Sequence, residues 1–181
     1  FQPNRLVDCP GNIAEMVVGV GCKVGGWYCH NPSILDTREV LDEQAILDRI
    51  KDNFLLDGVV ISGGEPTLQP DLLDFARKVK DMGLEVILDT NGLRPAVIKE
   101  GVEKGLFDYV AMDIKAPFDK ACVVTPTVPW NADKLRESVR YLMGQDKVPY
   151  EFRMTVIPQF TVEDVERAAQ EIAGARIFYL Q

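Results

Sequence analysis

Short apolar runs alternate with longer amphipathic segments along this chain, and this alternation constrains the fold more than any other feature. The apolar runs are mostly continuous, as is typical of parallel strands that are buried on both faces. We predict six strands, over Ala14–Val20, Gly58–Ser62, Glu85–Asp89, Tyr109–Ile114, Glu151–Ile157 and Arg176–Leu180. The segments between them predict helices over Arg38–Asn53, Pro70–Met82, Pro95–Lys104, Ala132–Met143 and Thr161–Ala173.

Capping residues mark several of the expected helix ends. Asp36 or Thr37 can cap the first helix, because short polar side chains accept hydrogen bonds from the first turn. Thr161 with Asp164 opens the last helix. Gly83 follows the second helix, where a left-handed residue is favoured.

The strand–helix repeats continue without a break in composition, which indicates one α/β domain over residues 1–181 with a parallel sheet. A chain of 181 residues is long enough for one domain with a sizeable core. Six such strands can form an open doubly wound sheet or a partial (β/α) barrel, and periodicity does not choose between them. In both folds, the residues that carry chemistry belong at the carboxyl ends of the strands.

Charge and cysteine content narrow the class of protein. The net charge of −8 argues against a general nucleic-acid binder, which would carry a basic face. No apolar run approaches the ~20 residues that span a bilayer, and no signal peptide is visible after Phe1. Cysteines without a secretory signal favour a reducing compartment over a disulfide framework. We therefore expect a cytoplasmic protein that binds neither nucleic acid nor a membrane.

The first predicted strand leads into the segment Cys22-Lys-Val-Gly-Gly-Trp-Tyr-Cys-His-Asn-Pro32. Cys22 and Cys29 are seven residues apart, which is a weak pattern by itself. They can be thiolate ligands of iron or buried small residues, the usual state of a free cysteine. His30 is the only histidine, and a single histidine is more often structural than a ligand. Tyr28 can anchor the loop through its ring.

A loop rich in glycine directly follows the second predicted strand, in the segment Ile61-Ser-Gly-Gly-Glu-Pro-Thr67. Gly63 and Gly64 allow a ligand to approach the backbone closely, and Pro66 prevents the strand from continuing. Glu65 supplies a carboxylate, which suits a cationic ammonium group. Taken alone, this segment can also be an ordinary turn between a strand and a helix.

Charged and polar residues end the third and fourth predicted strands. Asp89 and Asn91 lie in the segment Leu88-Asp-Thr-Asn-Gly92, and Asp113 and Lys115 belong to Asp-Ile-Lys. Because neighbouring parallel strands end at the same edge, these side chains should form a mixed-charge cluster. The spacing of Asp113 and Lys115 puts them on one side of a strand. The alternative is strand-end capping together with a salt bridge.

Arg153 stands in the middle of the otherwise apolar fifth strand, in Glu151-Phe-Arg-Met-Thr-Val-Ile-Pro158. An unpaired buried charge is costly, so this arginine needs a partner. The partner is either a structural carboxylate, such as Glu151 or Asp113, or a ligand with a carboxylate, for which arginine is well suited.

Together these motifs resemble those of the radical S-adenosylmethionine (SAM) enzymes, especially the branch that activates glycyl-radical enzymes. The matching motifs are Cys-His-Asn-Pro, Gly-Gly-Glu-Pro, Asp-Thr-Asn-Gly, Asp-Ile-Lys and Phe-Arg-Met-Thr-Val, and the resemblance extends from Asp8-Cys-Pro-Gly11 to the last strand. Within that branch, the chain is most similar to activating proteins of anaerobic ribonucleoside-triphosphate reductase. The resemblance implies a (β/α)6 partial TIM barrel.

The resemblance also implies a cofactor site. In this family, cysteines spaced Cys-x3-Cys-x-aromatic-Cys hold a [4Fe–4S] cluster, which assigns Cys22 and Cys29 as metal ligands. A monovalent cation can accompany the methionine carboxylate near Asp89 and Asp113, and Lys115 and Arg153 form the catalytic set. The residues implied to bind SAM are Tyr28, His30, Gly63, Gly64, Glu65, Pro66, Asp89, Asn91, Asp113, Lys115 and Arg153.

The implied activity is reductive cleavage of SAM, followed by removal of a hydrogen atom from a glycine of a partner enzyme. The implied partners are a glycyl-radical enzyme, with anaerobic ribonucleotide reductase as the first choice, and a flavodoxin- or ferredoxin-type electron donor. The cofactor supplies this chemistry, and no protein acid or base is required.

Position 26 departs from the family pattern, because Gly26 stands where the middle cluster cysteine is expected. Two hypotheses follow. The chain is an activase in which Cys122, or with less favour Cys9, completes the cluster, or it is a SAM-binding homologue or altered chain without radical activity.

Overall fold

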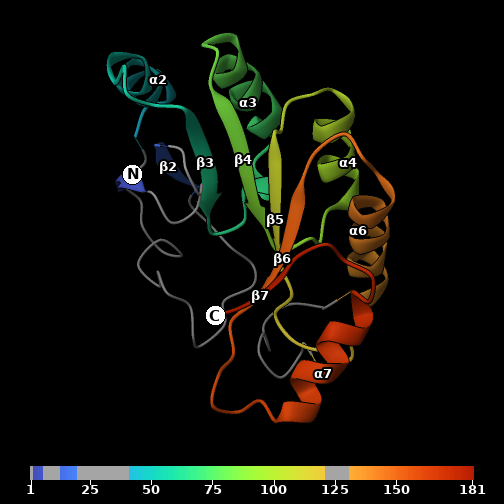
Figure 1. The fold of residues 1–181 in the computed structure, drawn as a ribbon. Helices are drawn as coiled ribbons and strands as arrows, with labels where there is room; N and C mark the ends of the chain where they lie inside the picture. The colour runs from blue at the N-terminus through green and yellow to red at the C-terminus, as the bar shows by residue number, and fades with distance from the viewer. Residues whose placement is uncertain (1, 6–12, 20–40, 121–130) are drawn as a thin grey trace.

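The computed structural model describes residues 2–5, 13–19, 41–120 and 131–181 and is built around one seven-stranded sheet (Figure 1). The strands are β1 (Gln2–Arg5), β2 (Ala14–Gly19), β3 (Gly58–Gly63), β4 (Glu85–Thr90), β5 (Tyr109–Asp113), β6 (Tyr150–Met154) and β7 (Phe178–Leu180). The helices are α2 (Glu43–Asp52), η1 (Pro66–Leu68), α3 (Leu72–Asp81), α4 (Pro95–Glu103), α6 (Ala132–Gly144) and α7 (Val162–Glu171).

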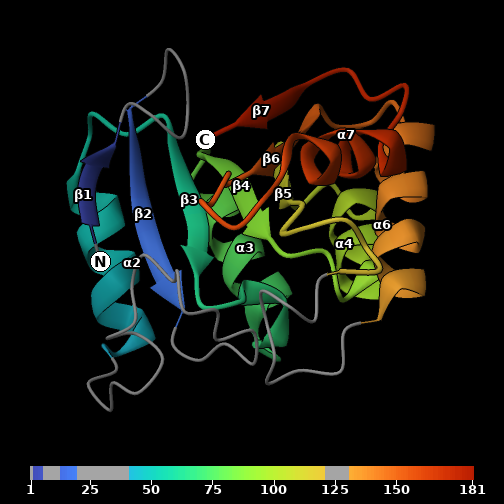
Figure 2. The same ribbon diagram turned by 90° about the horizontal axis from the view of Figure 1, so that it is seen from below.

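The strand order distinguishes a partial barrel from a doubly wound sheet. Strands β2 to β7 are all parallel and stand in chain order. A doubly wound sheet would reverse its order at a switch point, and the described sheet has no reversal. Right-handed crossovers in one direction put the described helices α2, α3, α4, α6 and α7 on the same face, and Figure 2 shows the helices following the sheet in sequence. The predicted (β/α)6 partial barrel is confirmed.

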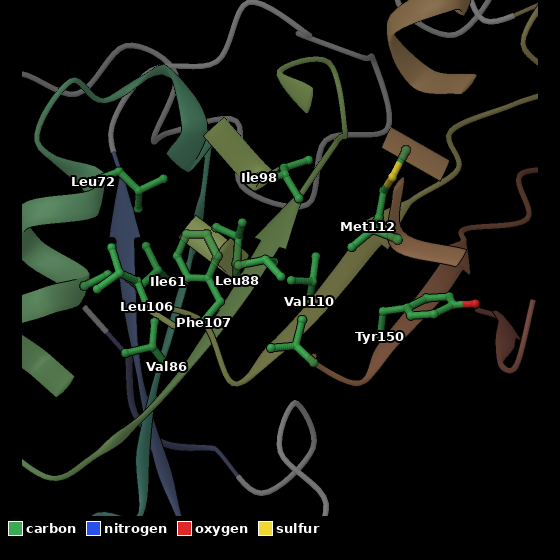
Figure 3. Close-up of a cluster of buried hydrophobic side chains, with 14 of the residues drawn as sticks. Ile61, Leu72, Val86, Leu88, Ile98, Leu106, Phe107, Val110, Met112 and Tyr150 are labelled. Carbon is green, nitrogen blue, oxygen red and sulfur yellow. The ribbon is translucent and has the colours of Figure 1, made fainter. Parts of the chain in front are cut away.

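A single large core lies between the sheet and its helices. Every second residue of the central strands points into it, including Val59, Val86 and Val110, which are fully buried. Helix α4 contributes Ile98, and Phe107 fills the space below it (Figure 3). Each fully buried side chain of this kind stabilises the fold by roughly 1.5–3 kcal/mol.

The opposite face of the sheet changes character along the strands. Near the amino ends of the strands it is apolar, with a small cluster formed by Ala14, Met16, Val60 and Ile87. Further along β4, β5 and β6, the same alternation places charged residues on this inner face, at positions 89, 113, 151 and 153. The inner face is therefore apolar at one end and polar at the end where sites are expected.

Two elements near the amino terminus were predicted wrongly. Strand β1 was not expected, because Gln-Pro-Asn-Arg has no apolar pattern; it pairs antiparallel to β2 at an edge, where proline is tolerated. Helix α2 begins at Glu43 instead of Arg38. Asp42 caps it by accepting hydrogen bonds from two amides of the first turn. The proposed caps at positions 36 and 37 lie outside the described residues.

The other end signals are confirmed. Thr161 and Asp164 form the capping box of α7, with both reciprocal hydrogen bonds present. Gly83 ends α3 with φ of 82°, in the left-handed region.

Predicted strands five and six are shorter than expected, since β6 ends at Met154 and β7 begins at Phe178. No helix among the described residues has both the length and the apolar character needed to cross a membrane.

Gly101 tests how closely α4 packs on the core. A Cβ atom there would lie 2.0 Å from Cε2 of Phe107, a buried ring that cannot move aside freely. We expect Gly101→Ala to lower the free energy of unfolding by about 2 kcal/mol in urea denaturation, because overpacking outweighs the helix preference of alanine.

Gly144→Ala is the matched control for this change. Gly144 is also in a helix, and a Cβ atom there would meet nothing within 4 Å. The free energy of unfolding of the Gly144→Ala variant should be unchanged or higher. Equal stabilisation by both substitutions would contradict the packing described for α4.

Candidate functional site

Charged residues gather on the inner face toward the carboxyl ends of β4, β5 and β6, and Glu151, near the start of β6, joins them. We refer to the set as the charged cluster: Asp89, Asp113, Lys115, Glu151 and Arg153. The strand register brings them together. Asp113 is paired with Arg153, and Ala111 is paired with Asp89 on one side and Glu151 on the other. Residues that are 40 or more positions apart in the sequence therefore share one small area of the inner face.

Arg153 crosses from β6 to β4 over the intervening strand. Its Nη1 atom lies 3.4 Å from Oδ1 of Asp89, and its Nε–H donates to Oε1 of Glu151. The side chain of Arg153 is only 12% exposed. The residue between these two carboxylates on β5 is Ala111, whose small side chain leaves room for the guanidinium.

Tyr109, at the start of β5, extends this network toward the amino ends of the strands. Its hydroxyl donates to Oε2 of Glu151 at 2.7 Å, so the two oxygens of Glu151 serve different donors. Burial and the adjacent Glu151 carboxylate raise the pKa of Tyr109 well above its ordinary value. Burial alone would lower the pKa of Arg153, but the neighbouring carboxylates outweigh it and raise that pKa, Asp89 most strongly. Tyr109 is therefore a neutral donor and Arg153 a permanent cation.

Lys115 lies just beyond β5 and forms an ion pair with Asp113. The Nζ–Oδ2 distance is 2.6 Å, and both side chains are partly open to solvent. This ion pair is the salt bridge that the sequence analysis gave as the alternative to a ligand site. The two interpretations are compatible, because a partly exposed ammonium group can donate to more than one carboxylate.

Glu65 is buried and joins the β3 loop to the end of β4. Only 3% of it is exposed. Oε1 accepts from the Thr67 amide at 3.1 Å, the Thr67 hydroxyl at 2.5 Å and the Thr90 hydroxyl at 2.7 Å. Oε2 accepts from the Asn91 amide at 2.8 Å. Burial raises the pKa of Glu65, while the bonds from Thr67, Asn91 and Thr90 act in the opposite direction.

Position 63 requires glycine because β2 and β3 lie very close to each other there. Its φ is 122°, and a Cβ atom would lie 2.5 Å from both the amide nitrogen and the carbonyl oxygen of Gly19. The next amide, of Gly64, donates to the Gly19 carbonyl at 3.0 Å. The sequence pattern had attributed these glycines to ligand approach, whereas at Gly63 the close neighbour is the backbone of β2. Pro66, also buried, begins η1.

The turn after β4 is similarly fixed. Asn91 is buried, and its side-chain oxygen accepts from the Leu93 amide at 3.0 Å. Gly92 has φ of 77°, and a Cβ atom there would lie 2.1 Å from Cε of Met112. The Gly92 carbonyl accepts from the Ser138 hydroxyl of α6 at 2.6 Å. The turn is held from three sides by protein contacts.

Most of the predicted site residues belong to this region, and the others lie outside the described residues. Positions 63–66, 89, 91, 113, 115 and 153 lie at or just after the carboxyl ends of β3 to β6. Tyr28, His30, Cys22 and Cys29 lie outside the described residues, as does Gly26. In the part of the chain that the structure describes, no group of three or more His, Cys, Asp or Glu side chains is arranged to hold a metal ion.

Sequence reasoning missed Tyr109, Thr67 and Thr90. A signal for Tyr109 existed, because positions 109, 111 and 113 share the face of Asp113 on β5. No comparable signal existed for Thr90, whose contact with Glu65 joins residues 25 positions apart.

Comparisons with known proteins identify the family of this chain. Residues 16–172 match the model of the radical SAM superfamily. A candidate glycyl-radical enzyme activating enzyme of Methanocaldococcus jannaschii is 32% identical over 181 residues, covering 97% of this chain and 75% of that protein. A pyruvate formate-lyase-activating enzyme of Clostridium pasteurianum is 33% identical over 118 residues, covering 61% of this chain and 48% of that enzyme.

A solved structure shows the same fold. The structure of native anSMEcpe with bound AdoMet and a peptide covers 92% of this chain, with a TM-score of 0.68 and 18% identity. The chain spans only 51% of that protein. Because the superfamily match extends over most of the sequence and includes the charged cluster and the Glu65 loop, this chain belongs to the radical SAM superfamily.

Proposed function

We propose that this chain binds SAM at the carboxyl ends of β3 to β6 and acts as an activating enzyme for a glycyl-radical enzyme. The observation that carries the proposal is the charged cluster beside the Gly-Gly-Glu-Pro loop, in a chain related to activating enzymes. The proposed partners are anaerobic ribonucleotide reductase and a flavodoxin- or ferredoxin-type electron donor, in the cytoplasm.

The charge of the site suits SAM. The charged cluster contains three carboxylates and two cations, which leaves one negative charge in excess. SAM carries a sulfonium, an ammonium and a carboxylate, and so has one net positive charge. We assign Lys115 and Arg153 to its carboxylate, and Asp89 and Asp113 to its cationic side. Asp89 and Asp113 already have cationic partners in Arg153 and Lys115. A monovalent cation near these two carboxylates stays a prediction.

The loop after β3 can receive the ammonium group. Oε2 of Glu65 accepts one hydrogen bond, from Asn91, and a carboxylate oxygen can accept more than one. The Gly63–Gly64 backbone stands beside it, at the end of β3. We assign the ammonium to this corner, with Pro66 and Asn91 lining it, and the adenine to Tyr28 and His30.

The iron–sulfur cluster fits this chain less well than SAM does. Bound together, a complete cluster and SAM supply the one-electron cleavage that produces a hydrogen-abstracting radical. Cys22 and Cys29 provide two thiolates, and Gly26 provides none, so the donor set is one short of the three that the family uses. This observation favours a second candidate function, namely a SAM-binding homologue without radical activity.

Another cysteine could replace the missing ligand, and the flanking residues favour Cys122. Cys122 follows Lys120, in the segment that leaves the carboxyl end of β5. Cys9 lies between Arg5 and Ala14, which are paired at the amino end of β2. The candidate site is at the opposite, carboxyl edge of the sheet.

Glu65 should be essential both for stability and for binding. Glu65→Ala leaves the buried donors of Thr67, Thr90 and Asn91 without their acceptor, so we expect a loss of about 3 kcal/mol in the free energy of unfolding. Isothermal calorimetry should also show weaker SAM binding. The matched control is Glu137→Ala on the exposed face of α6, with a change within about 0.5 kcal/mol. Unchanged SAM affinity in folded Glu65→Ala would remove Glu65 from the site.

Gly26→Cys should decide between the two functions. It restores the Cys-x3-Cys-x2-Cys spacing, so after anaerobic reconstitution we expect about four irons per chain and release of 5′-deoxyadenosine on reduction. The unaltered chain should retain little iron and release none. Equal release by both proteins would show that another residue completes the cluster, and Cys122→Ser would then abolish it. Iron bound in the variant without any release would contradict the activase.

A further inference from the structure

Tyr109 joins Glu151 and Arg153 of the charged cluster in a chain of two hydrogen bonds on the inner face of the sheet. The Tyr109 hydroxyl donates to Oε2 of Glu151, and Nε–H of Arg153 donates to Oε1. Glu151 has a side chain that is only 11% exposed. Because each carboxylate oxygen serves a different donor, the carboxylate cannot rotate without breaking a bond.

This arrangement restricts Arg153 in two directions. Glu151 fixes the Nε edge of the guanidinium, and Asp89 holds Nη1 at 3.4 Å from the other side. A planar guanidinium held along one edge and at one end has a single orientation. A long side chain that is already ordered loses less conformational freedom when a ligand binds.

We propose that Glu151 and Tyr109 are positioning residues, which fix the Arg153 guanidinium beside Asp89 and thereby set the affinity of the site for SAM. The inference rests on the proposed binding of SAM, but its geometry is a property of the protein alone. Neither residue needs to touch SAM, because both act through Arg153.

The chain provides its own control on the surface. Tyr141 of α6 donates to Oε1 of Glu103 at 3.0 Å, and Lys147 contacts the other oxygen of Glu103. The groups are the same, a tyrosine, a glutamate and a cation, but this set joins helices α4 and α6 and its Glu103 side chain is 43% exposed. Equivalent substitutions at the two places separate positioning in the site from general stabilisation.

The experiment compares Tyr109→Phe and Glu151→Gln with Tyr141→Phe and Glu103→Gln in the full chain, using calorimetry with SAM. We expect about fivefold weaker SAM binding for each inner-face variant, the effect of one lost buried hydrogen bond. Both surface variants should bind SAM like the unaltered chain. In an Arg153→Met background, Tyr109→Phe should have no further effect, since its action passes through Arg153.

A second measurement needs no ligand. The Arg153 Nε–H signal in nitrogen-15 NMR, assigned by its absence in Arg153→Lys, should exchange slowly with water and should shift or broaden in both inner-face variants. An unchanged signal would overturn the proposal. So would SAM binding that is unaltered by Tyr109→Phe, or an equal loss from the surface variants. If neither the unaltered chain nor any variant binds SAM, the proposed function and the affinity role fail together, and the NMR signal alone then decides whether Glu151 and Tyr109 position Arg153.

Discussion

The cationic side chain of Arg153, on the inner face of a parallel sheet, is the constraint on which the site depends. A charge in that position is tolerated only if carboxylates surround it, because burying it unpaired would cost several kcal/mol. The neighbouring strands supply them through the register: Glu151 two residues earlier on the same strand and Asp89 two strands away. Ala111 keeps the path between them open. The polar half of the inner face is thus one electrostatic unit.

The end of β4 connects this unit to the Gly-Gly-Glu-Pro loop. Asp89 points to the inner face and contacts Arg153, whereas the next residue, Thr90, donates to the buried Glu65. Alternation along a strand therefore lets adjacent residues take part in two networks on different sides. Because Asp89 and Thr90 are adjacent, the position of the Glu65 loop and the ion pair of Arg153 depend on the same end of β4.

The sequence predicted what depends on local pattern. Continuous apolar runs located β2 to β7, and the spacing of Thr161 and Asp164 located the start of α7. It failed where pairing between distant segments decides the structure. Gln2–Arg5 becomes a strand only because β2 offers an open edge. Similarly, the site residues could be identified one by one, but the bond between Glu65 and Thr90 requires the register of β3 against β4.

The choice between the two candidate functions depends on position 26. SAM binding and radical chemistry are separable because they depend on different residues. The charges that suit SAM come from the strands themselves, held by Arg153 and by the bonds of Glu65. The proposed cluster ligands, Cys22 and Cys29, lie in the sequence between β2 and α2. On the proposed function, a missing thiolate at position 26 would remove the redox chemistry without removing any group from the charged cluster. A chain of this kind can keep its affinity for SAM after it has lost its activity, which makes SAM binding alone insufficient to identify an activase.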